Sequence, residues 1–205
     1  MKIIIATRNL NKIKEITSII SIPDVEFMSM NNFPQIPEIH ETGTNFTENA
    51  LIKAKTVNKY TGYITMSDDS GLEIEALGNK PGINSSRFLG EKTDYNFKNN
   101  KILELLKSVP YNERKARFVC SIAICFNSED YKVVSGICEG YISSDIRGEQ
   151  GFGYDPIFLV PAYKKTYAEL NENIKNNISH RALALQKAKD IILERCGNQF
   201  KTKSF

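Results

Sequence analysis

The sequence of 205 residues has no tryptophan, only two histidines, four cysteines and no long hydrophobic run. We attribute the missing tryptophan, in a chain rich in asparagine, lysine and isoleucine, to genome composition. Only four apolar residues in a row follow Lys2, which is too few for the core of a signal peptide, and no other segment is long enough to span a membrane. These absences predict a soluble, cytoplasmic protein with no membrane partner.

The cysteines lack the spacing of a metal site, since no C-x2-C pair occurs among Cys120, Cys125, Cys138 and Cys196. Cys120 and Cys125 lie five residues apart on one expected strand, so their side chains point to opposite faces. A zinc ion shared by these two is therefore not expected. We expect small buried thiols in a reducing cytosol.

A strong charge imbalance is also missing. The net charge is +3, with 25% charged and 41% hydrophobic residues, which is ordinary for a globular protein. So small a charge does not argue for binding to nucleic acid, and we expect no such partner. The length fits one domain spanning residues 1–205, with one lobe or two.

Hydrophobic periodicity and turn residues divide the chain into strands and helices. Residues 2–7 are typical of a strand buried on both faces, and from Asn9 the apolar residues recur at helical spacing. Strands are expected at 2–7, 25–30, 63–67, 72–76, 116–126, 131–142 and 156–160, with 116–126 and 131–142 forming an antiparallel hairpin. Helices are expected at 9–20, 45–60, 94–107 and 179–196, the last capped by Ser179 and stopped by Gly197. This order predicts an α/β protein with a mixed sheet.

The first helix starts with cations, although the helix dipole favours acidic residues there. A bound phosphate would resolve this conflict, and scattered surface lysines and arginines are the alternative. The segment 7–12, TRNLNK, follows the first strand, where a phosphate loop is expected, although it lacks the P-loop frame. Thr7 and Asn9 can donate hydrogen bonds to phosphate, and Lys12 supplies charge. Asn11 can adopt the left-handed conformation that otherwise needs glycine.

The last helix has a similar start, with Lys175 before its cap and His180 and Arg181 in its first turn. Lys53 lies two turns into the second helix. For any one helix, surface cations are the better explanation. Two such starts together favour a polyphosphate site.

Asp68 and Asp69 are expected to close the strand 63–67, and Glu41 lies in a long loop before the second helix. Carboxylates suit Mg2+, which binds one or two of them together with substrate phosphates. A metal ion would also offset the repulsion between adjacent aspartates, and one aspartate could instead act as a general base on water. The alternative is a turn, capped by Asp68, in which Asp69 is merely solvated.

The segment GFGYDP carries two aromatic residues between glycines. Phe152 or Tyr154 could stack on a base while the flexible backbone reads its edge. A plain tight loop with a buried phenylalanine is the alternative.

Five segments together resemble the inosine/xanthosine triphosphate pyrophosphatases, which remove non-standard purine nucleotides. The segments, in order, are ATRNLNKIKEI, ETGTNFTENALIKA, SDDSGLEIEALGNKPGINSSRF, GFGYDPIF and KNNISHRALAL. They extend from Ala6 to Leu185. The resemblance implies an elongated α/β fold with a mixed sheet, two lobes around a central cleft that holds the active site, and a homodimer.

The resemblance also implies roles for individual residues. Asp69 is the catalytic base, and Mg2+ is surrounded by Glu41, Asp68 and Asp69. The purine nucleoside triphosphate is bound by residues from every matching segment. These are Thr7, Arg8, Asn9, Leu10, Asn11, Lys12, Lys53, Ser70, Phe152, Gly153, Tyr154, Asp155, Lys175, His180 and Arg181.

Two positions depart from the family pattern. The family commonly has glycine where this chain has Asn11, and asparagine tolerates the left-handed region. Position 40 is often acidic in the family, and here it is His40. The loop metal ligand is therefore Glu38 or Glu41, and Glu41 is preferred because it keeps its place before Thr42 and Gly43.

The expected reaction is hydrolysis of ITP, dITP or XTP to the monophosphate and pyrophosphate. Water activated by Asp69 would attack the α-phosphorus while Lys12 and Lys53 offset the charge of the leaving group. One alternative is a metal-dependent phosphatase, which would release orthophosphate. The other is a nucleotide-binding or RNA-binding module without activity, which would not need converging carboxylates.

Overall fold

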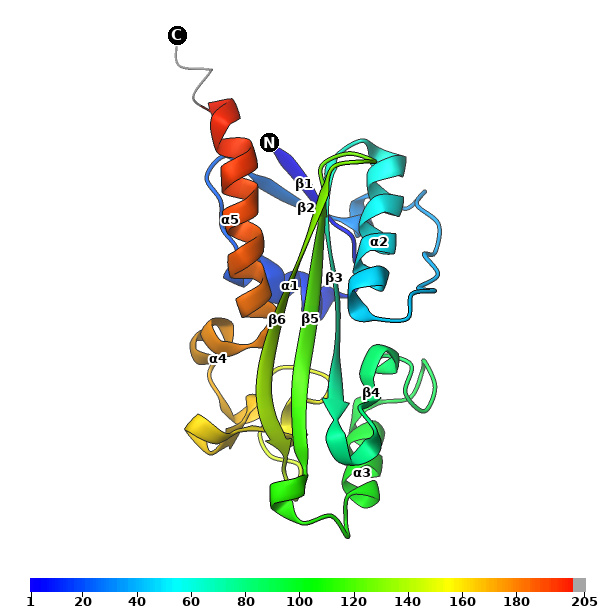
Figure 1. Ribbon diagram of the computed structural model, residues 1–205, viewed down its shortest axis with the longest axis vertical. Helices are drawn as coiled ribbons and strands as arrows, with labels where there is room; N and C mark the ends of the chain where they lie inside the picture. The colour runs from blue at the N-terminus through cyan, green and yellow to red at the C-terminus, as the bar shows by residue number, and fades with distance from the viewer. Residues whose placement is uncertain (201–205) are drawn as a thin grey trace. The chain divides into compact units, whose positions relative to one another are not determined.

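The computed structural model describes residues 1–200, with side chains described to residue 195, and has a mixed α/β fold (Figure 1). Its strands are β1 (Lys2–Ile5), β2 (Glu26–Ser29), β3 (Ile64–Ile74), β4 (Lys80–Pro81), β5 (Lys115–Cys125), β6 (Tyr131–Ile142), β7 (Phe158–Val160) and β8 (Lys165–Thr166). Its helices are α1 (Leu10–Ile19), α2 (Phe46–Thr61), α3 (Tyr95–Leu105), α4 (Glu172–Ile178) and α5 (His180–Phe200). Among the described helices, none is long and apolar enough to cross a membrane.

The strands form one mixed sheet with the order β2-β1-β3-β5-β6-β7-β8, and β4 pairs with β3. β1 is parallel to both β2 and β3, whereas β7 is antiparallel to β6 and β8. The pairing of Ile5 with Met66 places the end of β1 level with the third residue of β3. Because of this register, the loop after β1 begins beside residues 67–69 of β3.

The chain divides into two compact units. Unit 1 comprises Met1–Asp69, Cys120–Gly136 and the described residues from Arg181 onward. Unit 2 comprises Ser70–Val119 and Ile137–His180. The strands β3, β5 and β6 each contribute residues to both units.

In unit 1, helices cover both faces of the sheet, with α5 on one side and α2 on the other (Figure 1). Ile3 and Ile5 belong to a buried cluster that includes Ile16 of α1 and Leu185 of α5. Ile4, between them in β1, belongs to a separate cluster that includes Val57 of α2. This alternation confirms the prediction of a first strand that is buried on both faces.

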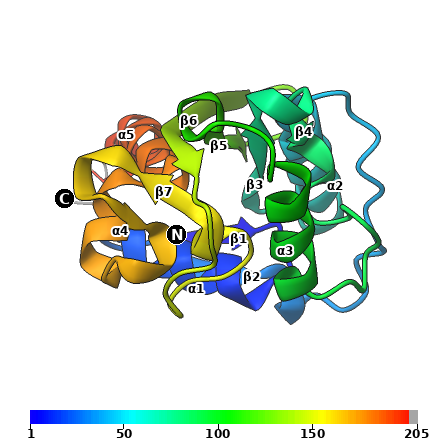
Figure 2. The same ribbon diagram turned by 90° about the horizontal axis from the view of Figure 1, so that it is seen from below.

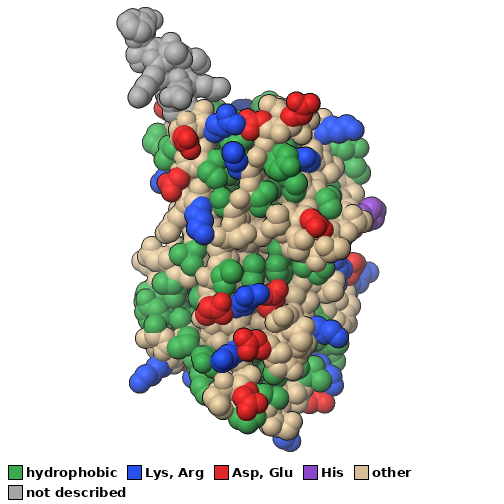
Figure 3. All heavy atoms as spheres, viewed as in Figure 1, with side chains coloured by type: hydrophobic (Ala, Val, Ile, Leu, Met, Phe, Trp, Pro, Cys, Tyr) green, Lys and Arg blue, Asp and Glu red, His purple; other side chains and the backbone are tan. Residues whose placement is uncertain are grey.

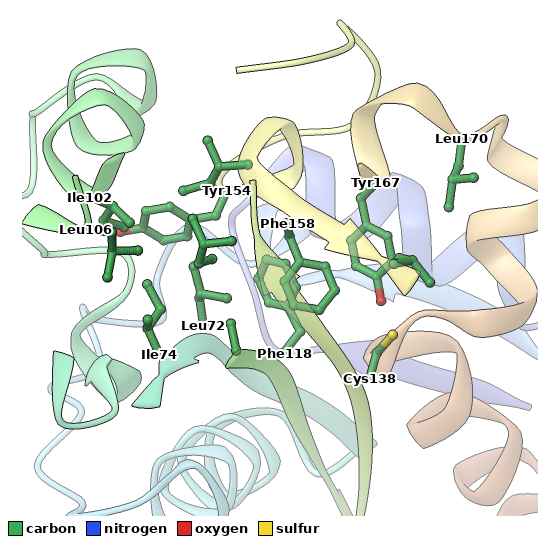
Figure 4. Packing of buried hydrophobic residues seen from close by; sticks show 14 residues of the cluster. Leu72, Ile74, Ile102, Leu106, Phe118, Cys138, Tyr154, Phe158, Tyr167 and Leu170 are labelled. Atoms are coloured by element: carbon green, nitrogen blue, oxygen red, sulfur yellow. The ribbon is translucent and has the colours of Figure 1, made fainter. Parts of the chain in front are cut away.

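In unit 2, a buried cluster joins β3, β5, β6 and β7 to α3 and to the segment 154–170 (Figure 4). Phe118 of β5 packs edge-on against Phe158 of β7, with 4.7 Å between ring centroids. Tyr167 stacks on Phe118 with an interplanar angle of 11°. Figure 2 shows α3 and α4 on opposite sides of this unit.

Most expected elements are present, and the mixed α/β class is confirmed. The strands expected at 116–126 and 131–142 are β5 and β6, which are neighbours in the sheet and are joined by a turn in which the Phe126 N–H donates to the Asp130 carbonyl. α2 ends as expected at Gly62, whose φ of 69° is left-handed. The prediction of a cap at Ser179 agrees with the start of α5 at the next residue.

Two predictions about these elements are wrong, and two short elements were missed. The two strands expected around the aspartate pair are one continuous strand, β3, because the chain makes no turn at Ser70 and Gly71. α5 continues through Gly197 to Phe200, since a glycine inside a helix costs only about 1 kcal/mol relative to alanine. The sequence also missed β8 and α4, which are short and therefore carry little periodic signal. Cys120, Cys125 and Cys138 are buried as expected, and the Cys196 side chain lies outside the described residues.

Candidate active site

Asp68 and Asp69 lie inside the continuous strand β3, not at its end. Successive side chains of a strand point to opposite faces, so the two carboxylates face away from each other. Both are buried, with 1% and 6% of the residue exposed. The turn alternative, with a capping Asp68 and a solvated Asp69, is therefore excluded.

Asp68 faces two cations of unit 1. Its Oδ2 is 3.0 Å from Nζ of Lys12 and 3.1 Å from Nη2 of Arg181, and Nη1 of Arg181 donates to Glu15. Burial alone would raise the pKa of Asp68, but Lys12 and Arg181 outweigh it and hold this pKa well below its ordinary value. Asp68 is therefore a permanently charged anchor for the start of α1.

Asp69 faces a different cation, Lys53 of α2. The Lys53 ammonium donates to Oδ1 of Asp69 at 2.9 Å and to Oε1 of Glu41 at 2.7 Å. Oδ2 of Asp69 is buried and has no hydrogen-bond partner among the described residues. Burial raises the pKa of Asp69, and the attraction of Lys53 offsets this only in part. A carboxylate with a raised pKa and an unused oxygen is suited to accept a proton.

Lys53 remains a cation although it is almost fully buried. Burial would lower its pKa, but the carboxylates of Asp69, Asp68 and Glu41 outweigh burial and raise it. The ammonium thus places a fixed positive charge between two carboxylates.

Glu41 is held near Lys53 by the fold of its loop. The Gly43 N–H donates to Oδ1 of Asn49, a fully buried residue of α2, at 2.8 Å. A Cβ at Gly43 would lie 2.7 Å from that oxygen and 2.9 Å from the Asn49 backbone nitrogen, so the approach requires glycine. Glu38 is exposed, whereas Glu41 is half-buried and pairs with Lys53.

The predicted metal site of three carboxylates is not present. Among the described residues, no group of three or more His, Cys, Asp and Glu side chains could hold a metal ion. The reason is the strand geometry, which turns Asp68 to the face opposite Asp69. Two carboxylates, Glu41 and Asp69, remain together around Lys53. Mg2+ commonly binds through one or two carboxylates and substrate phosphates, and the unused, buried Oδ2 of Asp69 fits such a ligand.

The segment 7–12 forms the loop and first turn that lead into α1, as predicted. The side chain of Asn9 caps the helix by accepting from the N–H groups of Asn11 and Lys12, at 3.0 and 3.2 Å. Thr7 accepts from the Asn9 N–H through Oγ1. The expected left-handed conformation of Asn11 is wrong, because Asn11 lies within the right-handed α1.

Two further residues of this segment were predicted to bind substrate. Arg8 donates from Nη2 to the carbonyl oxygen of Ile36 at 2.8 Å, so its guanidinium links the segment to the following loop. Leu10 is 72% exposed, which leaves the first residue of α1 open to solvent.

Asp155 organises the glycine-rich loop of unit 2. Its Oδ2 accepts from the Phe152 N–H at 2.8 Å and from Nζ of Lys175 at 2.6 Å. Gly151 has a φ of 78°, and a Cβ there would lie 2.0 Å from the same oxygen. The carbonyl of Gly153 accepts from the Asn99 side chain at 3.1 Å. The loop is therefore fixed by a buried ion pair.

The two aromatic residues of this loop have different environments. Tyr154 is 3% exposed, its hydroxyl donates to the Ser85 carbonyl, and its ring lies beside Ile102 and Leu106 (Figure 4). The suggestion that Tyr154 stacks on a base is therefore wrong for its ring. Phe152 is only half-buried, and Nζ of Lys175 lies 5.4 Å from its ring centroid.

The cations predicted at the start of the last helix lie on two helices. Lys175 belongs to α4, whereas His180 and Arg181 begin α5. His180 is 4% exposed and stacks on Phe118 at 4.6 Å, with an interplanar angle of 10°. Ser70 follows Asp69 in β3 and is half-buried.

Sequence reasoning missed three residues of these arrangements. Glu15 holds Arg181, and its position three residues after Lys12 was the available signal. Gly43 and Asn49 fix the Glu41 loop, and only their place in the segment ETGTNFTEN indicated this.

Comparisons with known proteins show which family this chain resembles over nearly its whole length. A family model described as the Ham1 family matches residues 3–191. A protein of Bacillus cereus named dITP/XTP pyrophosphatase is 45% identical over 195 residues, covering 94% of this chain and 95% of that protein. A protein of the same name from Desulforamulus reducens is 44% identical over 192 residues, covering 94% and 96%. The solved structure of a HAM1 protein from Coxiella burnetii has a TM-score of 0.87 and 39% identity, covering 95% of this chain and 99% of that one.

Proposed function

Because the chain belongs to the Ham1 family and its relatives are named dITP/XTP pyrophosphatases, we propose that it hydrolyses dITP, XTP and ITP. The products are the nucleoside monophosphate and pyrophosphate, which removes non-standard purine nucleotides from the pool. The observation that carries the proposal is the environment of Asp69. Oδ2 of Asp69 is buried and unused, and the pKa of this carboxylate is raised. The carboxylate lies beside the ammonium of Lys53, a cation that can bind a triphosphate.

The triphosphate is bound in this proposal by unit 1. Thr7, Asn9 and Lys12 lie at the carboxyl end of β1, beside residues 67–69 of β3. Lys12 and Lys53 supply positive charge from α1 and α2. Two cations fixed by buried carboxylates favour an anionic ligand without needing to reorganise.

Asp69 orients a water molecule and accepts one of its protons. The water oxygen forms a bond to the α-phosphorus as the bond from that phosphorus to the bridging oxygen breaks. The electron pair of the broken bond leaves with pyrophosphate, whose charge Lys12 and Lys53 offset. Alignment and charge stabilisation supply most of the rate enhancement, as in other phosphoryl transfers.

Mg2+ is the cofactor in this proposal, and Glu41 and Asp69 would hold it. When bound, it supplies additional positive charge to the phosphate oxygens. Asp68 is not a ligand, because its carboxylate is committed to Lys12 and Arg181 on the opposite face of β3.

The nucleoside is bound by residues of unit 2. Phe152 offers a half-buried ring, and Lys175 and Asp155 form a buried ion pair behind it. His180 and the backbone of Gly153 are candidates to donate to a 6-keto oxygen, and Ser70 contacts the substrate next to Asp69. A donor that faced the 6-amino group of adenine would lose its partner, which costs about 1–3 kcal/mol for each contact.

The proposal also includes a homodimer in the cytoplasm, with no nucleic-acid partner. On the face shown in Figure 3, acidic and basic side chains are interspersed, and the net charge of +3 is too small to argue for binding to nucleic acid.

One assay tests the function. The protein is incubated with dITP, XTP, ITP, GTP and ATP, with and without Mg2+, and the products are separated by ion-exchange chromatography. We expect monophosphate and pyrophosphate from dITP, XTP and ITP, far less from ATP, and dependence on Mg2+. Release of orthophosphate would indicate a phosphatase, and binding without any product would indicate a non-catalytic module. The same assay with the variant Asp69→Asn tests the catalytic base. The variant Asp190→Asn, which removes an exposed carboxylate of α5, serves as its control.

A further inference from the structure

Four charged side chains of unit 1 form a continuous chain of contacts. Glu15 accepts from Nη1 of Arg181, and Nη2 of Arg181 lies 3.1 Å from Oδ2 of Asp68. The same oxygen of Asp68 lies 3.0 Å from Nζ of Lys12. The chain therefore begins and ends on α1, and it passes through α5 and β3 on the way.

Exposure differs along this chain. The Asp68 and Arg181 side chains are 1% and 3% exposed, whereas Lys12 and Glu15 are 17% and 13% exposed. The two middle groups are thus a buried anchor, and Lys12 is the cationic end that a ligand can reach. The guanidinium of Arg181 contacts two carboxylates, Glu15 and Asp68, so it links α5 to α1 and β3.

Charge balance explains why Glu15 matters at a distance from Lys12. Arg181 and Lys12 both approach one oxygen of Asp68, so the two cations compete for a single negative charge. Glu15 adds a second negative charge, which attracts the guanidinium through its contact with Nη1. Without this second carboxylate, Arg181 would draw more strongly on Asp68, and the attraction of Asp68 for Lys12 would weaken.

We infer that Glu15 is a positioning residue for triphosphate binding, which acts through Arg181 and Asp68 to fix the ammonium of Lys12. The inference rests on the proposed function, since Lys12 is taken to contact the phosphates. Glu15 itself touches no substrate. Its contribution depends on the presence of Lys12, and this dependence can be measured.

The test is a double-mutant cycle between Glu15→Gln and Lys12→Met, with dITP as substrate. We expect Glu15→Gln alone to lower kcat/KM about tenfold, mainly by raising KM, as coupling between contacting charges allows. In the Lys12→Met background, the same change should cost less than about twofold, because the cation that it positions is gone. Equal losses in both backgrounds would overturn the inference, since a general loss of stability does not depend on Lys12.

Two controls separate charge from packing. Glu15→Asp keeps the charge on a shorter side chain and should recover part of the affinity. Glu26→Gln removes an exposed carboxylate of β2, whose partner Lys2 lies 3.8 Å away, and should leave KM unchanged. Thermal melting of every variant identifies any that fail to fold. If Glu15→Gln fails to fold, the comparison of KM between Glu15→Asp and the wild type tests the positioning role instead.

A second readout keeps this inference distinct from the proposed function. Calorimetry measures the affinity for inorganic tripolyphosphate, which needs no hydrolysis. One outcome is that the wild type hydrolyses dITP while the effects of the Glu15 and Lys12 changes simply add, both in kcat/KM and in the affinity for tripolyphosphate. In that case the positioning role is wrong and the function stands. If dITP is not hydrolysed but the affinity for tripolyphosphate shows the coupling, the function is wrong and the positioning role stands. Absence of both activity and binding would overturn both.

Discussion

Asp68 and Asp69 are consecutive residues of β3, yet their carboxylates bind different cations on the two faces of the strand. Asp68 pairs with Lys12 and Arg181, and Asp69 pairs with Lys53. Each negative charge therefore has its own positive partner, which offsets the repulsion between neighbours without a metal ion. The two aspartates therefore have different roles. Asp68 anchors the start of α1, and Asp69 has an oxygen that is available to accept a proton.

This division predicts different consequences for the two aspartates. Asp69→Asn keeps the shape of the side chain but removes the proton acceptor, so turnover of dITP should fall on the order of 100-fold or more. Steady-state rates with saturating dITP and Mg2+ measure the effect, and the melting temperature shows whether the fold is intact. Turnover close to that of the wild type would remove Asp69 from its role.

Asp68→Asn should mainly reduce stability. The change leaves the buried Arg181 and the half-buried Lys12 without their shared carboxylate, and breaking a buried ion pair costs about 3–5 kcal/mol. Urea denaturation at neutral pH measures the loss in the free energy of unfolding. A loss below about 1 kcal/mol, typical of a surface ion pair, would contradict the anchoring role.

The pH dependence of this loss has a definite sign. The pKa of Asp68 is held below its ordinary value, so its charged form stabilises the folded state fully above the unfolded-state pKa of about 4. The contribution is lost as the pH falls toward the folded-state pKa. The difference between wild type and Asp68→Asn should thus be the same at about pH 8 and about pH 5, and shrink only below about pH 4. A difference that already shrinks between pH 8 and 5 would contradict the low pKa.

Gly43→Ala should disturb the loop that carries Glu41. The added methyl group would lie 2.7 Å from Oδ1 and 2.9 Å from the backbone nitrogen of Asn49, and this helix backbone cannot move aside. We expect a loss of about 1–3 kcal/mol in stability and a higher Mg2+ concentration for half-maximal rate. Thr42→Ala, at the exposed neighbouring position, is the matched control and should change neither quantity.

Substitutions of the two aromatic residues of the glycine-rich loop should have different effects on KM for dITP. Phe152→Leu removes the half-buried ring and should raise KM for dITP by about tenfold, the scale of stacking on one base. Tyr154→Phe removes only the hydrogen bond to Ser85, so it should cost about 1 kcal/mol of stability and leave KM unchanged. The reverse pattern would mean that the hydroxyl of Tyr154, and not the ring of Phe152, meets the substrate.

The sequence predicts those parts of the fold that depend on local signals. The strand expected at 2–7 and the helices expected at 45–60 and 94–107 correspond to β1, α2 and α3, because hydrophobic pattern and backbone preference are local signals. Short elements such as α4 and β8 carry too few residues for a periodic signal, and tertiary contacts decide them. The order of strands was also beyond reach, because pairing between β1 and β3 depends on the whole unit.

The candidate site shows the same limit. The residue types and their segments were readable, and Lys12 and Asp68 do meet, as do Lys53, Glu41 and Asp69. Ser70 and Gly71 suggested a turn, however, and this local preference hid the continuous strand. Since alternation along a strand decides which face each aspartate takes, the wrong element also placed Asp68 on the same side as Asp69 and Glu41. Glu15 was missed because its partner Arg181 is distant in sequence.

Hydrolysis of dITP in water enriched in oxygen-18, followed by mass spectrometry of both products, shows which phosphorus atom the water attacks. Attack on the α-phosphorus by a water that Asp69 orients places the label in dIMP and leaves the released pyrophosphate unlabelled. Label in the pyrophosphate, with unlabelled dIMP, would show that water attacks the β-phosphorus and would contradict the account.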